Sequence, residues 1–127
     1  MIFKLRKKSL ANLQGVNPEL VQFIKSLEGR MCPVDFCITE GLRTKERQKE
    51  LFDAGKSKTM NSKHLTGNAI DICIILPRCR NVWDKKEFPE RKKCIDWIKG
   101  EAIRQNVITK LRFGADWGRD WPHIEML

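Results

Sequence analysis

The sequence predicts a small α+β domain in which helices pack on a mainly antiparallel sheet. Capped segments with helical apolar spacing dominate the first half of the chain, and short apolar segments rich in β-branched residues follow them. The chain has 127 residues, of which 41% are hydrophobic, so it can form one domain with its own core but not two ordinary ones. We therefore expect residues 1–127 to form a single domain.

The first helix is expected to begin after Asn17. Asn17 suits an N-cap, and Pro18 suits the first helical position. Apolar residues then recur on one face before Gly29, namely Leu20, Phe23, Ile24 and Leu27. The next segment, residues 34–39, alternates apolar and polar side chains and predicts a strand.

Two more helices follow from caps and spacing. Thr44 is expected to cap a helix that continues to about Ala54, and Gly55 ends it. A later helix is indicated by apolar residues at helical spacing, although Gly100 weakens its middle. These residues are Cys94, Ile95, Ile98, Ala102 and Ile103.

The remaining apolar segments predict the sheet. Residues 69–76 form a run rich in isoleucine that is typical of a buried strand, and residues 111–115 and 123–126 are the other strand candidates. Because the helical patterns mostly precede these strands, we expect a sheet that is mainly antiparallel and carries the functional groups on one face.

Three residues far apart in the chain form a candidate zinc site: His64, Asp71 and His123. The chain contains only two histidines, so neither arises from a histidine-rich composition. Two imidazoles and one carboxylate can hold Zn²⁺ with one position left open, whereas structural zinc sites close all four positions and favour thiolates. The ligand set therefore indicates catalysis.

The spacing between His64 and Asp71 requires a turn. Residues seven apart on one strand point to opposite faces, so the two cannot share a strand and a face. Gly67 can adopt the positive φ that such a turn needs. Asp71 is the single charged residue in the apolar run that follows, and a buried carboxylate needs a cationic partner, for which a metal ion is suited.

Asp120 precedes His123 by three residues and is the candidate general base. Pro122 disfavours a helical conformation at Trp121, so the segment is expected to be extended or turned. The Asp120 carboxylate can then lie beside the third ligand, where it can accept a proton from water activated by zinc.

These motifs resemble the zinc peptidoglycan peptidases related to VanY and VanX, and they are most similar to the L-alanyl-D-glutamate endopeptidases used as phage endolysins. The resemblance depends on Ser-x-His-x-x-Gly-x-Ala-x-Asp at residues 62–71, on a carboxylate three residues before the second histidine, and on Leu-Arg-Phe-Gly-Ala-Asp-Trp at residues 111–117. It continues upstream through residues 9–13, 16–20 and 39–44, through Gln48, and through residues 54–59.

The resemblance implies His64, Asp71 and His123 as zinc ligands and Asp120 as the catalytic base, in a zinc peptidase domain. It also implies that Arg43 stabilises the polarised carbonyl oxygen of the substrate. The family often has glutamate at the base position, so aspartate is a departure, although some phage endolysins of this type also use it. The activity implied is cleavage of the L-Ala-D-Glu bond of peptidoglycan stem peptides, and a D,D-carboxypeptidase is the nearest alternative.

Each assignment has a plainer interpretation. Asp71 can belong to a salt bridge, Asp120 can cap a turn, and Arg43 can form an ordinary ion pair with Glu40 or Glu46. Trp117 and Trp121 suit a core as well as a substrate platform, and Asp116 and Glu125 are candidates to orient the imidazoles.

The net charge of +9 indicates an anionic partner, which can be a nucleic acid, lipid headgroups or the cell wall. A basic nucleic-acid-binding domain without catalysis is therefore a second alternative. The sequence has no RNP, zinc-finger or helix-turn-helix signature, so we expect no specific nucleic-acid partner. We expect the anionic cell envelope instead.

The sequence also predicts a location. The longest apolar stretch is far shorter than the roughly 20 residues of a membrane span, and the basic N-terminus lacks the apolar segment of a secretory signal. The five cysteines are odd in number and have no paired CxxC spacing, which is typical of reduced thiols in a cytoplasm. Cys32 and Cys37 are an alternative metal site, less favoured than the one with two histidines. We expect a monomer made in the host cytoplasm that reaches the cell wall by a route other than a signal peptide.

Overall fold

The computed structural model describes residues 1–75, 88–117 and 120–127. The helices are α1 (Lys7–Asn12), α2 (Pro18–Ser26), α3 (Lys45–Asp53) and α4 (Phe88–Arg104). The strands are β1 (Phe36–Glu40), β2 (Ala69–Ile74), β3 (Leu111–Phe113) and β4 (His123–Met126). Short 3-10 helices are η1 (Lys63–Thr66), η3 (Ile108–Lys110) and η4 (Gly114–Trp117). The predicted α+β class is confirmed.

The strands form a four-stranded sheet in the order β1-β2-β4-β3, and every neighbouring pair is antiparallel. Residues opposite one another in an antiparallel pair point to the same face. Asp71 lies opposite His123, and Glu125 lies between Ala69 of β2 and Arg112 of β3. The polar residues of the three strands thus share one face.

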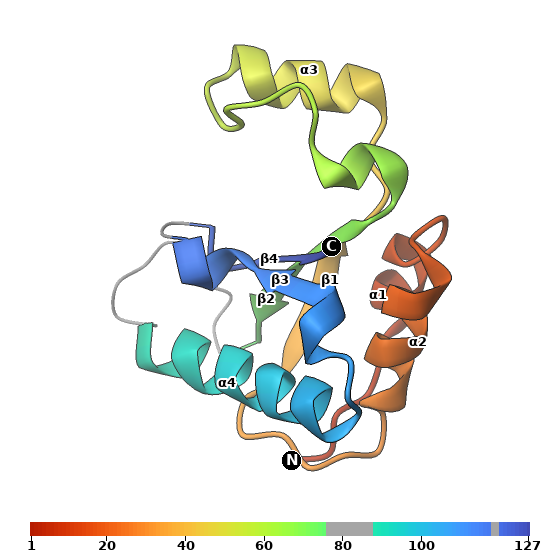
Figure 1. The fold of residues 1–127 in the computed structure, drawn as a ribbon, viewed down its shortest axis with the longest axis vertical. Helices are drawn as coiled ribbons and strands as arrows, with labels where there is room; N and C mark the ends of the chain where they lie inside the picture. Colours follow the sequence, from red (N-terminus) through yellow and green to blue (C-terminus); the bar gives the residue numbers. More distant parts are fainter. Residues whose placement is uncertain (76–87, 118–119) are drawn as a thin grey trace.

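The other face of the sheet carries the hydrophobic core. Ile70, Ile72 and Ile124 point into it and are at most 1% exposed. They belong to one buried cluster with apolar residues of α2 and α4, including Phe23, Ile24, Ile95 and Ile98. Figure 1 shows α4 running across one side of the sheet with α1 and α2 beside it. The polar face of the sheet is therefore held by a packed layer beneath it.

The predicted N-caps of α2 and α3 are confirmed, whereas α2 ends at Ser26, before the predicted end at Gly29. The Asn17 side chain accepts a hydrogen bond from the Glu19 backbone N–H at 2.9 Å, and the Thr44 side chain accepts one from the Arg47 backbone N–H at 3.1 Å. Gly55 follows α3 with a φ of 73°. These caps supply partners for backbone groups that a helix end leaves unpaired.

Several element bounds differ from the predictions. Strand β1 begins at Phe36, two residues after the start of the predicted strand 34–39. Strand β3 ends at Phe113, before the predicted end at residue 115, because Gly114 begins η4. Helix α1 was not predicted, since it has six residues, no side-chain cap and a single buried side chain, Ser9. Residue 76 of the predicted strand 69–76, and Cys79, lie outside the described residues.

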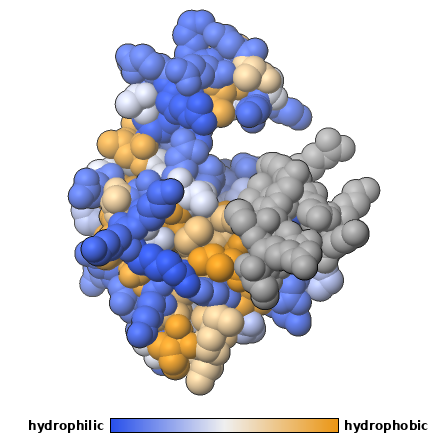
Figure 2. Space-filling model, turned by 180° about the vertical axis from the view of Figure 1, so that it is seen from behind, coloured by the Kyte–Doolittle hydropathy of each residue, from blue (hydrophilic) through white to orange (hydrophobic). Residues whose placement is uncertain are grey.

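Helix α3 lies at the opposite end of the molecule from α4 (Figure 1). Its surface, and that of the segment that returns from it, is mostly hydrophilic, as the upper lobe of the space-filling view shows (Figure 2). Figure 2 also shows that the surface is hollowed beneath this lobe. Among the described helices, none is long and apolar enough to cross a membrane.

Candidate metal centre

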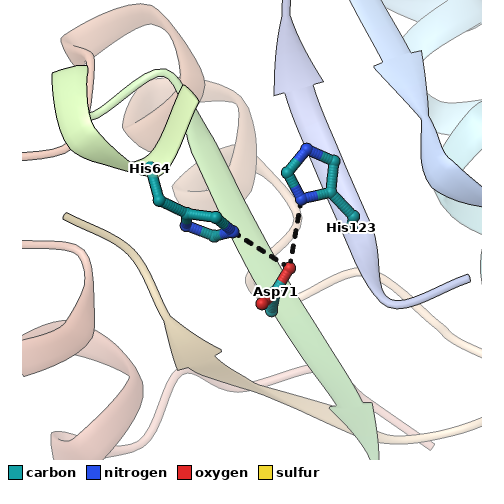
Figure 3. A group of neighbouring side chains, drawn as sticks. All are labelled: His64, Asp71 and His123. Carbon is teal, nitrogen blue, oxygen red and sulfur yellow. Dashed lines mark hydrogen bonds and ion pairs between the residues drawn. The ribbon is translucent and has the colours of Figure 1, made fainter. Parts of the chain in front are cut away.

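The structure brings His64, Asp71 and His123 together from three elements: η1, β2 and β4 (Figure 3). The Asp71 Oδ1 atom lies 3.2 Å from His64 Nε2 and 3.3 Å from His123 Nδ1. The three candidate ligand atoms all lie within 4.8 Å of one another. The predicted residues therefore form a cluster that can hold a metal ion.

The turn that separates His64 from Asp71 has the predicted form. The Ser62 side chain accepts a hydrogen bond from the His64 backbone N–H, and Gly67 ends η1 in the left-handed conformation with a φ of 75°. A Cβ on Gly67 would lie 2.4 Å from the Gly15 carbonyl oxygen, so a larger residue would push η1 away from the loop beneath it. Glycine is thus required here by both conformation and close packing.

Each imidazole is held through the nitrogen that faces away from the cluster. His64 Nδ1 lies 2.8 Å from the Gly41 carbonyl oxygen, and His123 Nε2 lies 2.8 Å from Glu125 Oε1. Both partners are acceptors, so each of these nitrogens carries the proton. In the neutral form of each ring, which binds a metal, the lone pairs are on His64 Nε2 and His123 Nδ1, the nitrogens that face Asp71; in the metal-free protein a proton on these nitrogens donates to Asp71 Oδ1.

Two of the three separations between the candidate ligand atoms match the edge of a tetrahedral zinc site, and the third, between His64 Nε2 and His123 Nδ1, lies within 4.8 Å. Zinc–nitrogen distances of about 2.0–2.1 Å place neighbouring donors of a tetrahedron roughly 3.3 Å apart. The two distances from Asp71 Oδ1, 3.2 and 3.3 Å, agree with that spacing. With two imidazoles and one carboxylate the cluster leaves one tetrahedral position without a protein ligand.

The charges of the cluster also suit a cation. Burial alone would raise the pKa of Asp71, but hydrogen bonds from His123 and His64 outweigh it and hold that pKa well below its usual range. Burial would lower the pKa of His123, but its hydrogen bond to Asp71 and the charge of that carboxylate outweigh burial and raise the pKa. Asp71 therefore stays ionised and favours positive charge beside it.

Arg43 lies next to the cluster. Its Nε and Nη2 atoms donate to the two carboxylate oxygens of Glu40 at 2.6 and 2.8 Å, and its Nη1 atom donates to Gln48 Oε1 at 2.7 Å. The plainer interpretation, an ion pair with Glu40, is thus present. Nη2 also lies 3.7 Å from Asp71 Oδ2, the oxygen that faces away from the histidines.

Gln48, one of the residues on which the resemblance rests, was given no role by the sequence analysis and belongs to the site. It is fully buried, although most other residues of α3 are polar and exposed. Besides accepting from Arg43, its amide nitrogen donates to Ser57 Oγ at 2.8 Å and to the Thr59 carbonyl oxygen at 2.5 Å. Gln48 therefore ties the segment after α3 to Arg43. The place of Gln48 in the resemblance marks the residue, but a lone glutamine in this helix does not indicate which partners it contacts.

Asp120 lies at the edge of the cluster, with its Oδ2 atom 4.0 Å from His123 Nδ1. Its side chain is 49% exposed, so water can reach it. Partial burial raises its pKa, the charge of His123 counteracts this, and the nearby Asp71 carboxylate adds to the increase. The Asp120 carboxylate faces the same imidazole nitrogen that faces Asp71.

Gly114 permits this placement of Asp120. A Cβ on Gly114 would lie 1.9 Å from the Asp120 carbonyl oxygen and 3.0 Å from His123 Cβ. Both distances are shorter than an ordinary contact, so the segment that carries Asp120 can pack at this position only against glycine.

The other candidates divide between the site and the surface. Glu125 contacts His123 as described, whereas Asp116 forms an ion pair with Lys99 at 2.5 Å. Trp121 is buried in the core. Trp117 is 43% exposed, and its ring packs edge-on against His123 with ring centroids 5.8 Å apart.

Comparisons with known proteins identify the family of the chain. The sequence pattern of the family described as phage L-alanyl-D-glutamate peptidase matches residues 1–125. The L-alanyl-D-glutamate peptidase of Escherichia phage T5 is 35% identical over 121 residues, which cover 92% of this chain and 83% of that protein. The peptidoglycan L-alanyl-D-glutamate endopeptidase CwlK of Bacillus subtilis is 30% identical over 105 residues, which cover 74% of this chain and 62% of CwlK.

A solved structure has the same fold. The crystal structure of the Serratia marcescens L-Ala D-Glu endopeptidase ChiX matches 99% of this chain and 90% of its own, with a TM-score of 0.80 and 31% sequence identity. The resemblance inferred from the motifs is therefore confirmed, and the chain belongs to the family of phage L-alanyl-D-glutamate peptidases.

Proposed function

We propose that this chain is a zinc-dependent endopeptidase that cleaves the L-Ala-D-Glu bond of peptidoglycan stem peptides and acts as an endolysin in bacterial cell-wall lysis. The observation that carries the proposal is the convergence of His64, Asp71 and His123, whose ligand atoms lie within 4.8 Å of one another. The relatives named for L-alanyl-D-glutamate peptidase activity support the choice of bond.

His64, Asp71 and His123 would hold the zinc ion through His64 Nε2, Asp71 Oδ1 and His123 Nδ1. When bound, the ion supplies Lewis acidity, which polarises a peptide carbonyl and lowers the pKa of water at the open position. Gly41 and Glu125 hold the opposite nitrogens of the imidazoles and so fix which nitrogens face the ion.

Asp120 would act as the general base. Its carboxylate is 4.0 Å from His123 Nδ1 and half-exposed, so it can accept a proton from the attacking water and pass it to the leaving amine. Its raised pKa brings the carboxylate nearer to the range in which a base also returns the proton effectively.

Arg43 would stabilise the negative charge that develops on the carbonyl oxygen. A guanidinium has five N–H donors, and three are used in the bonds to Glu40 and Gln48. The other two remain to contact a substrate oxygen while Glu40 and Gln48 hold the group in place. The ion pair with Glu40 thus supports this role instead of competing with it.

We propose that residues 1–127 act as one catalytic domain and as a monomer. We also propose that the protein is made in the host cytoplasm, acts on the cell wall, and is attracted to the anionic envelope by its net charge of +9.

Removal and return of the metal test the mechanism. Protein purified without added metal should contain one zinc per chain, chelation should abolish peptidoglycan hydrolysis, and added zinc should restore it. His64→Ala and His123→Ala should lose both zinc and hydrolysis. Full activity in demonstrably metal-free protein would refute the proposal.

A further inference from the structure

Glu125 and Lys63 connect the two histidine-bearing elements on the side away from Asp71. We propose that this link is a positioning device: Glu125 orients His123, and Lys63 ties Glu125 and strand β4 to the turn that carries His64. The inference rests on the proposed function, because its purpose is to hold the two imidazoles at the spacing that one metal ion needs.

Glu125 is placed to fix the ring of His123. Its Oε1 atom lies 2.8 Å from His123 Nε2, and both side chains are only 10% exposed. An ionised carboxylate offers acceptors alone, so the shared proton stays on Nε2 and the lone pair on Nδ1. Without Glu125, the ring could rotate or exchange the roles of its two nitrogens.

Lys63 extends the contact to η1. It precedes His64 in the chain, and its Nζ atom donates to the Met126 carbonyl oxygen at 2.5 Å and lies 3.6 Å from Glu125 Oε2. The ammonium therefore contacts both the backbone of β4 and the carboxylate that orients His123. Displacement of η1 from β4 would break both contacts.

Arg112 completes the surroundings of the carboxylate. It lies opposite Glu125 in the β3–β4 register, and its Nη1 atom is 3.9 Å from Glu125 Oε2. Glu125 Oε2 thus has cations on two sides, whereas Oε1 is directed to His123. This division lets one carboxylate serve the imidazole and the neighbouring elements together.

The test is a measurement of zinc affinity by competition with a chromogenic chelator. Loss of a partner that orients a ligating histidine typically weakens metal binding about 10- to 100-fold, which we expect for Glu125→Ala. Glu125→Gln should lose less, because its amide oxygen can still accept from Nε2–H. Lys63→Met keeps the aliphatic stem and should also weaken zinc binding.

A double substitution tests whether Lys63 acts through Glu125. If it does, Lys63→Met combined with Glu125→Ala should weaken zinc binding by less than the product of the two separate effects. Strictly independent effects would overturn the link between the two residues.

Glu101→Gln is the matched control. Glu101 is as buried as Glu125, at 8% exposed, and is paired with Arg30 and Arg104, but it lies in α4 away from the cluster. Its substitution should lower the melting temperature of the metal-free protein and leave zinc affinity unchanged. The Glu125 and Lys63 variants should instead lose zinc affinity out of proportion to any change in melting temperature.

The outcomes separate the two proposals. Wild-type protein that binds no zinc would refute the proposed function itself. If the wild-type protein binds zinc and the Glu125→Ala and Lys63→Met variants bind it with the same affinity as the wild type, the positioning role is overturned. The proposed function then remains intact. A zinc affinity that falls equally in Glu101→Gln would also overturn it, because the effect would then be general destabilisation.

Discussion

Replacing Gly114 with alanine should impair catalysis by displacing Asp120 while all three candidate metal ligands remain. The added Cβ would lie 1.9 Å from the Asp120 carbonyl oxygen. Carbon–oxygen contacts relax at about 3.3 Å, so the backbone at Asp120 has to move by roughly 1.4 Å. A displacement of about 1 Å in an active site can cost 100-fold in rate. We therefore expect kcat/KM to fall at least about 100-fold.

The assay is hydrolysis of a soluble stem peptide at saturating zinc, with bound zinc measured on the same samples. Gly114→Ala should retain one zinc per chain, because the added methyl group approaches His123 less closely, at 3.0 Å. Gly100→Ala is the control, since nothing lies within 4 Å of its Cβ in α4. It should keep wild-type activity and stabilise the helix by about 1 kcal/mol. Wild-type turnover in Gly114→Ala would refute the requirement for this placement of Asp120.

Three further predictions concern protons and charge. Asp120→Asn should keep zinc and lose activity because it removes the proton acceptor; near-normal turnover would exclude Asp120 as the base. Because folding raises the pKa of His123, protonation of this residue stabilises the metal-free protein. The stabilisation is complete at pH values below the ordinary histidine pKa of about 6.5, and it is lost as the pH rises through the raised pKa. The melting temperature of the metal-free protein should fall across that range, and a similar fall in His123→Asn would contradict the assignment. Salt should weaken lysis of sacculi but barely affect hydrolysis of a soluble stem peptide; equal sensitivity would exclude envelope attraction.

The parts of the fold that depend on local chemistry could be predicted from the sequence. Asn17, Thr44 and Gly55 act within one helical turn, so their residue types indicate the helix ends directly. The turn at Gly67 followed from the spacing of His64 and Asp71, because the period of a strand excludes a shared face. Helix α1 has none of these local signals, since its position depends on packing against β1.

The candidate site could be predicted in its ligands but not in their supports. Two histidines and an aspartate are typical metal ligands, so the sequence indicates the roles of His64, Asp71 and His123 directly. The roles of Gln48, Gly114 and Lys63 depend on partners that are distant in the sequence. Lys63 meets Glu125 only because β2 and β4 pair in one register, and Gly114 meets Asp120 only because η4 folds back. Such contacts depend on tertiary structure and leave no local pattern.

The most direct test of the central claim is mass spectrometry of the products released from purified peptidoglycan by the zinc-loaded protein. Cleavage of the L-Ala-D-Glu bond should release peptides that begin with D-Glu and leave L-Ala alone on the glycan strands. The same digestion with His64→Ala should give neither the released peptides nor glycan strands that carry L-Ala alone. Free D-alanine as the sole product would instead show a D,D-carboxypeptidase, and tight duplex-DNA binding without any cleavage would contradict the enzymatic account altogether.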